Sequence, residues 1–231
     1  MGGCMSDVSE FRRWLQAYLP GADLRFQALP GCRGLELLLI APGYAVHLLS
    51  QQQIERLSDD PPYWIFCWAS GLALARAILD GEVLVKDKVV ADFGCGSGVV
   101  AIAAKMAGAR RVYACDIDTR CCRLAGLNAQ HNGTEINVIS ALTDIAEPVD
   151  LVLAADVLYE RKNLVFLDHM LDVCGDVLVA DSRLKTMPDG RFVPVQTVYT
   201  PSFPDYGEAK ENSRVCLYRA GGGAVAETAG H

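Results

Sequence analysis

The chain has 231 residues, of which 51% are hydrophobic and 21% charged, and this composition suits one large α/β domain with a well-filled core. The formal net charge of −7 disfavours nucleic acid as a partner, and the apolar runs are too short to span a bilayer. Nine cysteines without a C-x-x-C pair indicate reduced thiols inside a cell, and neither a disulfide framework nor a metal site is expected. Charged residues interrupt the N-terminal stretch, so no secretory signal is expected; the expected location is the cytoplasm, with the mitochondrial matrix as the alternative in a eukaryote.

The first 60 residues predict a small α+β extension. Asp7 and Glu10 have the spacing of a capping box, and apolar residues recur behind them at helical intervals, so a helix is expected to start at Asp7 and to end before Pro20. Nothing in this segment indicates what it recognises. The other elements expected here are strands at 24–28 and 35–40, a candidate third strand at 44–49, and a polar helix at 51–57 capped by Ser50.

Residues 61–79, PPYWIFCWASGLALARAIL, carry four aromatic residues just ahead of a helix. The helix is expected to start near Ser70 and Gly71, with a buried stripe at every third or fourth residue. Aromatic residues in front of a helix are as readily explained by core packing as by contact with a ligand. For Tyr63 and Trp64 both interpretations stay open.

Residues 91–98, ADFGCGSG, stand between a β-branched run and a helix of small residues. The run predicts a short buried strand that leads to Asp92, and the three glycines after it predict a tight turn. The helix is expected over 99–107, closed by Gly108 in the position that favours a left-handed cap. A strand, a glycine-rich turn and a helix in this order are typical of a nucleotide cradle at the carboxyl edge of a parallel sheet.

The spacing of these glycines narrows the kind of nucleotide. The third glycine of a dinucleotide fingerprint would fall on Val99, and Gly98 is not followed by the Lys and Ser or Thr that a P-loop requires. Asp92 would repel a phosphate there, whereas it suits a ligand with an ammonium group. S-adenosylmethionine (SAM) carries an ammonium group and a sulfonium and has no phosphate, so it is the cofactor that the turn favours.

Two later acidic residues are expected at the same edge of the sheet. A strand over 111–115 ends at Asp116, 22 residues after the first glycine of the turn, where doubly wound folds place the carboxylate that holds ribose hydroxyls. Asp118 is expected to cap the helix that follows. A fully apolar strand over 149–155 delivers Asp156 to this edge.

The loop that follows a third strand is expected to border the adenine. In this loop Leu142 is placed to cover the base, and Thr143 or Asp144 to meet its amino group. The remaining expected elements are helices at 119–129 and 163–173, strands at 136–140, 176–180, 191–199 and 214–218, and a disordered tail from residue 221 onward.

Two of these segments resemble known methyltransferases. Residues 91–98 resemble motif I of the class I, seven-β-strand SAM-dependent methyltransferases. Trp68 and Ser70-Gly71 resemble the W-x-x-x-W-P-S-G segment of the family 16 protein-lysine methyltransferases, in which the Trp and the Ser-Gly line the SAM pocket. Ala69 departs from that pattern, because the family often has Pro there.

The segment D-V-L-Y at 156–159 resembles the D/E-x-x-Y/F motif of the same lysine methyltransferase family. Enzymes that methylate base amines or glutamine amides carry an N-P-P-Y-like segment at this place, which the chain lacks. Glu160 alone does not supply the carboxylate cluster of a catechol-type metal site. The nearest likeness is to the enzymes that methylate the β subunit of electron-transfer flavoprotein, over residues 61 to about 182; it does not cover the N-terminal third.

The resemblance implies an α/β, Rossmann-like, doubly wound sheet of seven strands, mostly parallel with an antiparallel last strand. It also implies an extension over 1–60 and a methyltransferase domain over 61–220, followed by the tail at 221–231. SAM is the implied cofactor, and no metal is implied. The implied catalytic residues are Asp156 and Tyr159, and the implied cofactor-binding residues are Trp68, Ser70, Gly71, Asp92, Gly94, Gly96, Gly98, Asp116, Leu142 and Asp156.

The expected reaction is methyl transfer to a nitrogen, most readily a protein lysine. Neutralising a lysine at pH 7 costs roughly 4–5 kcal/mol, and burial beside aromatic walls supplies part of that shift. Asp156 is expected to orient the amine and to accept its proton, while Tyr159 and Trp68 stack around the methyl path. A small-molecule N-methyltransferase of the nicotinamide-methylase type and a SAM-binding subunit without catalysis are the alternatives. The sequence leaves the oligomeric state and the number of methyl groups open.

Overall fold

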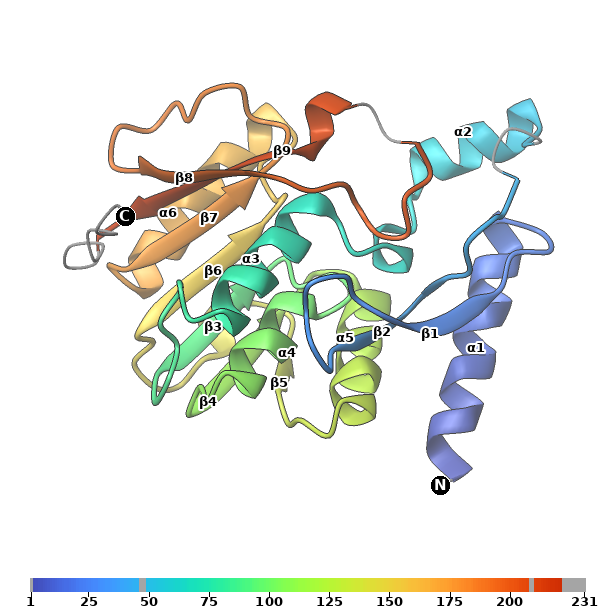
Figure 1. Ribbon diagram of the computed structural model, residues 1–231, viewed down its shortest axis with the longest axis horizontal. Coiled ribbons are helices and arrows are strands. Elements are labelled where there is room, and N and C mark those ends of the chain that lie inside the picture. Colours follow the sequence, from blue (N-terminus) through green and yellow to red (C-terminus); the bar gives the residue numbers. More distant parts are fainter. Residues whose placement is uncertain (1, 46–48, 208–209, 222–231) are drawn as a thin grey trace.

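The computed structural model describes residues 2–45, 49–207 and 210–221. Seven strands form one sheet in the order β5-β4-β3-β6-β7-β9-β8 (Figure 1). β9 is the one antiparallel strand of the seven, because both β7 and β8 pair with it in that sense. The predicted mostly parallel, seven-stranded sheet is therefore confirmed. The strands are β3 (Val89–Phe93), β4 (Arg111–Cys115), β5 (Asn137–Ile139), β6 (Leu151–Ala155), β7 (Val177–Asp181), β8 (Val193–Tyr199) and β9 (Arg214–Ala220).

Helices cover both faces of this sheet, so its central strands are apolar on both sides. Val90 and Leu151 point into a core shared with α3 and α4, whereas Ala91 and Val152 point into a second core that includes residues of α6. The helices are α3 (Ala69–Leu79), α4 (Val99–Met106), α5 (Thr119–His131) and α6 (Val165–Val173), with 3-10 turns at Tyr63–Ile65, Leu142–Asp144, Arg161–Leu164 and Lys210–Ser213.

The first helix and the hairpin of the N-terminal extension (blue in Figure 1) pack against α5, whereas its second helix (cyan, upper right) lies away from α5. A third hydrophobic core of the molecule lies here and joins Phe11 and Leu15 of α1 to Leu124 of α5 and to Trp64, which is fully buried. Trp64 is thus a packing residue. The elements of the extension are α1 (Gly2–Tyr18), the antiparallel hairpin β1 (Leu24–Ala28) and β2 (Glu36–Ile40), and α2 (Gln51–Asp59).

Two expectations for the extension are corrected. The helix begins at Gly2, so Asp7 and Glu10 lie inside it and do not cap it. Glu10 instead accepts two hydrogen bonds from Arg123 of α5, at 2.8 and 2.9 Å, and this tertiary ion pair explains its presence on that face. Residues 44, 45 and 49 form no strand, and the rest of the third candidate strand, 46–48, lies outside the described residues.

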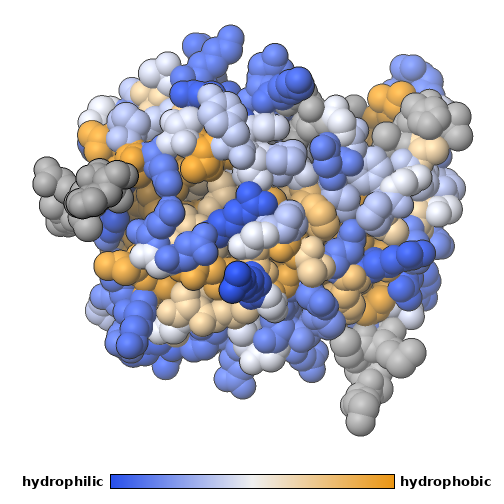
Figure 2. Space-filling view, in the orientation of Figure 1, coloured by the Kyte–Doolittle hydropathy of each residue, from blue (hydrophilic) through white to orange (hydrophobic). Residues whose placement is uncertain are grey.

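The surface of the molecule mixes polar and apolar residues. Figure 2 shows apolar side chains between hydrophilic ones over the middle of one face. No helix in the described ranges has both the length and the apolar character needed to cross a bilayer. The eight cysteines whose side chains are described are all free, and no three metal-binding side chains cluster among the described residues. The expected tail, apart from Gly221, lies outside the described residues.

Candidate cofactor and active site

The carboxyl ends of β3, β4, β6 and β7 meet at one edge of the sheet, as their parallel pairing requires. This edge carries the glycine loop after β3, Asp116 after β4, Asp156 after β6, and Ser182 after β7. Acidic residues far apart in the chain are thereby gathered at one place. The sequence-derived site residues lie on or beside this edge.

Backbone hydrogen bonds to β4 hold the glycine loop in place. The N–H groups of Gly94 and Cys95 both donate to the carbonyl oxygen of Cys115, at 2.8 and 3.0 Å. The N–H of Gly96 donates to Oδ2 of Asp116 at 2.9 Å. A Cβ built on Gly96 would meet no atom within 4 Å, so the loop is open on that side.

Two glycines of the loop are required by close packing as well as by backbone conformation. Gly94 has φ +72°, and a Cβ there would lie 2.5 Å from Cγ1 of Val157. Gly98 has φ +83°, and a Cβ there would lie 2.9 Å from Cα of Ala125 on α5. Because L side chains are strained at such φ values, any substitution would meet both penalties.

Asp92 lies under the loop and is only 1% exposed. Its Oδ2 accepts a hydrogen bond at 3.0 Å from the N–H of Ala101, in the first turn of α4. Burial raises the pKa of Asp92 to about 7, the Ala101 N–H opposes that rise, and the nearby charge of Asp116 adds to it. The carboxyl group of Asp92 is therefore half protonated near neutral pH.

Asp116 accepts backbone hydrogen bonds on both oxygens, from Gly96 at Oδ2 and from Asp118 at Oδ1, each at 2.9 Å. Burial also raises the pKa of Asp116. Each oxygen keeps a further lone-pair position, which a hydroxyl donor can use. Asp118 caps α5 as expected, accepting from the N–H of Arg120 at 2.8 Å. Ile117 between the two acids is 93% exposed, and sequence reasoning missed it.

Asp156 is held by four donors from two other segments. Its Oδ1 accepts from the hydroxyls of Ser70 and Ser182, both at 2.7 Å, and from the N–H of Ser182 at 2.9 Å. Among the described residues, its Oδ2 accepts only from the N–H of Ser70, at 3.1 Å. The residue has φ +53°, an uncommon conformation for a non-glycine residue that marks a constrained site. Oδ2 thus keeps acceptor capacity, while Oδ1 is fully used.

Three aromatic side chains form a group near Asp156 and its partner Ser70: Trp68 is two residues before Ser70, and Tyr159 is three residues after Asp156. The ring of Tyr63 lies 6.1 Å from that of Trp68 and 5.7 Å from that of Tyr159, centroid to centroid. The indole Nε1 of Trp68 donates to the carbonyl of Tyr63 at 2.9 Å. Tyr63 and Tyr159 are 42% and 48% exposed, so Tyr63 belongs to this aromatic group and not to the core. The guanidinium of Arg183 lies 5.9 Å from the Trp68 ring.

Ser182 and its neighbour Asp181 are further residues that sequence reasoning missed. Asp181 is fully buried; its Oδ1 accepts from the N–H groups of Arg183 and Leu184 at 2.7 Å, and its Oδ2 has no hydrogen-bond partner among the described residues. Burial raises the pKa of Asp181. The polar D-S pair at the end of the otherwise apolar β7 was the available signal, because polar residues at strand ends of this edge tend to belong to binding sites.

The loop after β5 is folded onto itself. Leu142 is 7% exposed and packs with the core on the α6 side of the sheet. Asp144 accepts from the N–H of Ala141 at 3.1 Å and from the Ser140 hydroxyl at 3.3 Å. The Asp144 carboxylate therefore closes its own turn.

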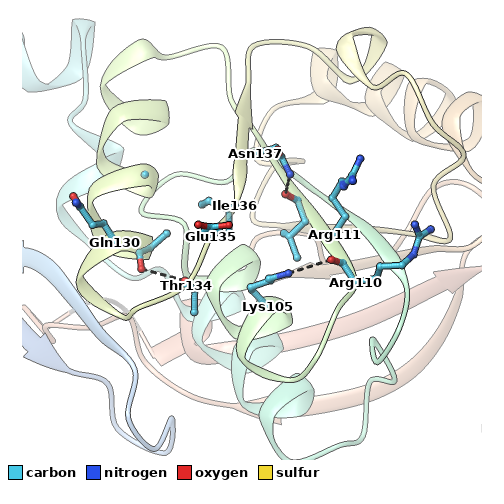
Figure 3. A pocket seen from close by; sticks show the side chains of 11 residues that line it. Lys105, Arg110, Arg111, Gln130, Thr134, Glu135, Ile136 and Asn137 are labelled. Atoms are coloured by element: carbon cyan, nitrogen blue, oxygen red, sulfur yellow. Dashed lines mark hydrogen bonds between the residues drawn. The ribbon is translucent and has the colours of Figure 1, made fainter.

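A cavity of about 770 Å³ lies at the opposite, amino edge of the sheet (Figure 3). Its polar side chains bond to the protein itself: Lys105 donates to the carbonyls of Ala109 and Arg110, and Arg111 pairs with Glu147. None of the sequence-derived site residues lines this cavity. It is separate from the edge described above.

Comparison with known proteins gives the following likenesses. The family model of ribosomal protein L11 methyltransferase (PrmA) matches residues 73–164. The electron transfer flavoprotein beta subunit lysine methyltransferase of Homo sapiens is 37% identical over 116 residues, which are 49% of this chain and 44% of the relative. Its homolog in Caenorhabditis elegans is 32% identical over 139 residues, 58% of this chain and 57% of the relative.

The chain thus spans about half the length of these curated relatives. Among solved structures, SMU.776, described as a methyltransferase in complex with SAH, superposes with a TM-score of 0.54 at 12% identity. The superposition covers 87% of this chain and 56% of that one, and the likeness is one of fold.

Proposed function

We propose that this chain, whose residues 73–164 match the PrmA family model, is a SAM-dependent methyltransferase that acts on a lysine side chain of a protein. The observation that carries the proposal is that two sets of residues, one suited to a cofactor and one suited to an acceptor amine, lie at the same edge of the sheet. One is the glycine loop locked to Asp116, and the other is Asp156, fixed by Ser70 and Ser182. A purely structural turn would need neither the open side at Gly96 nor an aspartate held at φ +53° at the same edge of the sheet.

The residues of the loop edge fit SAM or its product S-adenosylhomocysteine (SAH). The free lone-pair positions of Asp116 suit the two ribose hydroxyls, and the open side of Gly96 leaves room for the nucleoside. Ile117 offers an exposed apolar surface for the adenine, with Leu142 contributing only a small exposed part. Asp92, ionised above pH 7, supplies negative charge under the loop for the cofactor's ammonium group. We assign the remaining contacts to Trp68, Ser70, Gly71, Gly94 and Gly98.

SAM supplies the activated methyl group and its leaving group, so the chain has to position and desolvate the acceptor nitrogen. Oδ2 of Asp156, with its spare acceptor capacity, orients an incoming amine and receives its proton. The three donors on Oδ1 keep the carboxylate from turning away. An aromatic wall is formed by Tyr63, Trp68 and Tyr159. By excluding water it favours the neutral form of the amine, and its ring faces attract a positively charged group.

A protein lysine is the acceptor that we favour over a small amine. The curated relatives named above are lysine methyltransferases that act on a protein subunit. The net charge of −7 favours a basic protein substrate over nucleic acid. We assign residues 1–60 to an extension and 61–220 to the catalytic domain.

We place the enzyme in the cytoplasm, or in the mitochondrial matrix of a eukaryote, because its described thiols are free.

The test combines thermal unfolding with and without SAH and incubation of the protein with labelled SAM and a cell lysate. We expect SAH to raise the melting temperature, and label to appear on lysine in a discrete protein band. Asp156→Asn should lose the label while the SAH shift remains, and Glu135→Gln, an exposed carboxylate at the opposite edge, should behave as wild type. Label confined to small molecules would replace the protein substrate by a small amine, and absence of any SAH shift would refute the SAM site.

A further inference from the structure

The fully buried side chain of Asn128, in the last turns of α5, joins two distant segments. Its Oδ1 accepts from the N–H of Leu38 in β2 at 2.8 Å, and its Nδ2 donates to the carbonyl of Ser97 in the glycine loop, also at 2.8 Å. One partner is an N–H and the other a carbonyl, so the chemistry fixes the orientation of the amide. A single side chain thereby links the N-terminal hairpin to the candidate cofactor loop.

Asn132, which caps the C-terminal end of α5, makes a matching contact with the hairpin only. Its Oδ1 accepts from the N–H of Glu36 at 2.9 Å, and its Nδ2 donates to the carbonyls of Glu36 and Asn128, each at 2.7 Å. Four helical residues rise about 6 Å, and two strand residues about 6.6 Å, so the two asparagines fit alternate peptides of β2. The two asparagine side chains therefore hydrogen-bond to peptide groups on one edge of β2, and β1 pairs with the other edge.

We propose that Asn128 is a positioning residue of the cofactor loop, and that through it the docking of the β1–β2 hairpin is coupled to cofactor affinity. Ser97 is 4% exposed and lies between Gly96 and Gly98, which both have positive φ. A carbonyl between two such flexible residues needs an external anchor, and Asn128 supplies it. The proposal rests on the SAM site proposed above and gives the N-terminal extension a role in it.

The coupling arises because the buried side-chain amide of Asn128 is destabilised when one of its two hydrogen-bond partners is lost. If the hairpin moves away, Oδ1 of Asn128 loses the Leu38 N–H, and a buried polar atom left without a partner destabilises that arrangement. The amide then gains by reorienting, which releases Ser97. Coupling is reciprocal, so a ligand that fixes the loop must also fix the hairpin at Leu38.

The wild-type protein allows a direct test by amide hydrogen exchange, measured residue by residue by NMR with and without saturating SAH. We expect SAH to slow exchange of the Leu38 amide at least fivefold. The Thr134 amide, which donates to the carbonyl of Ala129 just past the end of α5 and lies outside the hairpin, serves as the internal control and should change less than twofold. Equal changes at both amides, or no change at Leu38 although SAH binds, would overturn the coupling.

Two matched variants test the anchor itself by calorimetric titration with SAH. Asn128→Asp keeps an acceptor for Leu38 but loses the donor to Ser97, and Asn132→Asp loses its donors without touching the loop. We expect Kd for SAH to rise at least tenfold in Asn128→Asp and less than twofold in Asn132→Asp. A purely structural role would lower the stability of both and leave Kd unchanged in both. If Asn128→Asp does not fold, the exchange measurement decides; failure of SAH to bind the wild type would overturn both proposals.

Discussion

The buried carboxyl group of Asp92 should make the stability of the unliganded protein fall as pH rises towards neutrality. Burial raises its pKa from 3.8 to about 7 in the folded state. The folded protein therefore binds the Asp92 proton more tightly than the unfolded chain does. For a raised pKa, the stabilising contribution is complete below pH 4 and is lost as pH rises through 7.

The size of the effect follows from the two pKa values. A difference of this size corresponds to about 4 kcal/mol between the fully protonated and fully ionised limits. About half of it, on the order of 2 kcal/mol, falls between pH 5.5 and pH 8. Asp92→Asn has no titration at this position, so it should lack this part of the pH dependence. Its amide oxygen can still accept the hydrogen bond from Ala101.

The assay is urea unfolding of the wild type and of Asp92→Asn at pH 5.5, 6.5 and 8, without ligand. We expect the stability of the wild type, relative to the variant, to fall by about 2 kcal/mol over this range. Other titrating groups, including Asp116 with its raised pKa, are present in both proteins and cancel to first order. Parallel pH profiles, within about 0.5 kcal/mol, would refute the assignment of a raised pKa to Asp92.

Further predictions concern the same edge of the sheet. SAM affinity should rise with pH between 6 and 8, by up to about tenfold per unit below pH 7, and titration calorimetry of the wild type against Asp92→Asn measures it. Ile117→Ser should weaken SAH binding by roughly fivefold to thirtyfold, or 1–2 kcal/mol, with unfolding unchanged, whereas Leu84→Ser, 71% exposed and remote, should change neither. Gly98→Ala should cost about 2–5 kcal/mol in chemical denaturation, because strain and the contact with Ala125 add, and an unchanged midpoint would contradict the packing. Asp156→Asn should lower the rate of methylation at least a hundredfold with less than a threefold change in Kd for SAH; a near-normal rate would exclude its proton-accepting role.

The fold and the loop edge could be predicted because their signals are local. The run from Val89 to Met106 specifies strand, turn and helix within 18 residues, and Asp116 and Asp156 follow at strand ends that any parallel sheet brings together. The capping box at Asp7 was wrong for the opposite reason. The acidic residues at 7 and 10 do not cap the helix; they pair with Arg123, which lies more than a hundred residues away in the chain.

Residues whose role depends on distant partners could not be identified from the sequence. Ser182 follows an expected strand, which places it at this edge, but its hydrogen bonds with Asp156, 26 residues away, are not visible in the sequence. The two partners of Asn128 lie 31 and 90 residues away, so no local pattern points to its role. Ile117 is different, because an apolar residue between two aspartates is visible in the sequence, but only its 93% exposure shows that it is not core.

The close contacts of the glycine loop also bear on how this chain can change in evolution. Gly94 leaves no room for a Cβ against Val157, and Gly98 leaves none against Ala125. Positions 94 and 157, and positions 98 and 125, are therefore expected to vary together across related chains, if they vary at all. A glycine loop transplanted alone into another scaffold would lack the two surfaces that shape it. The loop, Ala125 of α5 and Val157 after β6 therefore have to be kept together for the loop to hold its shape.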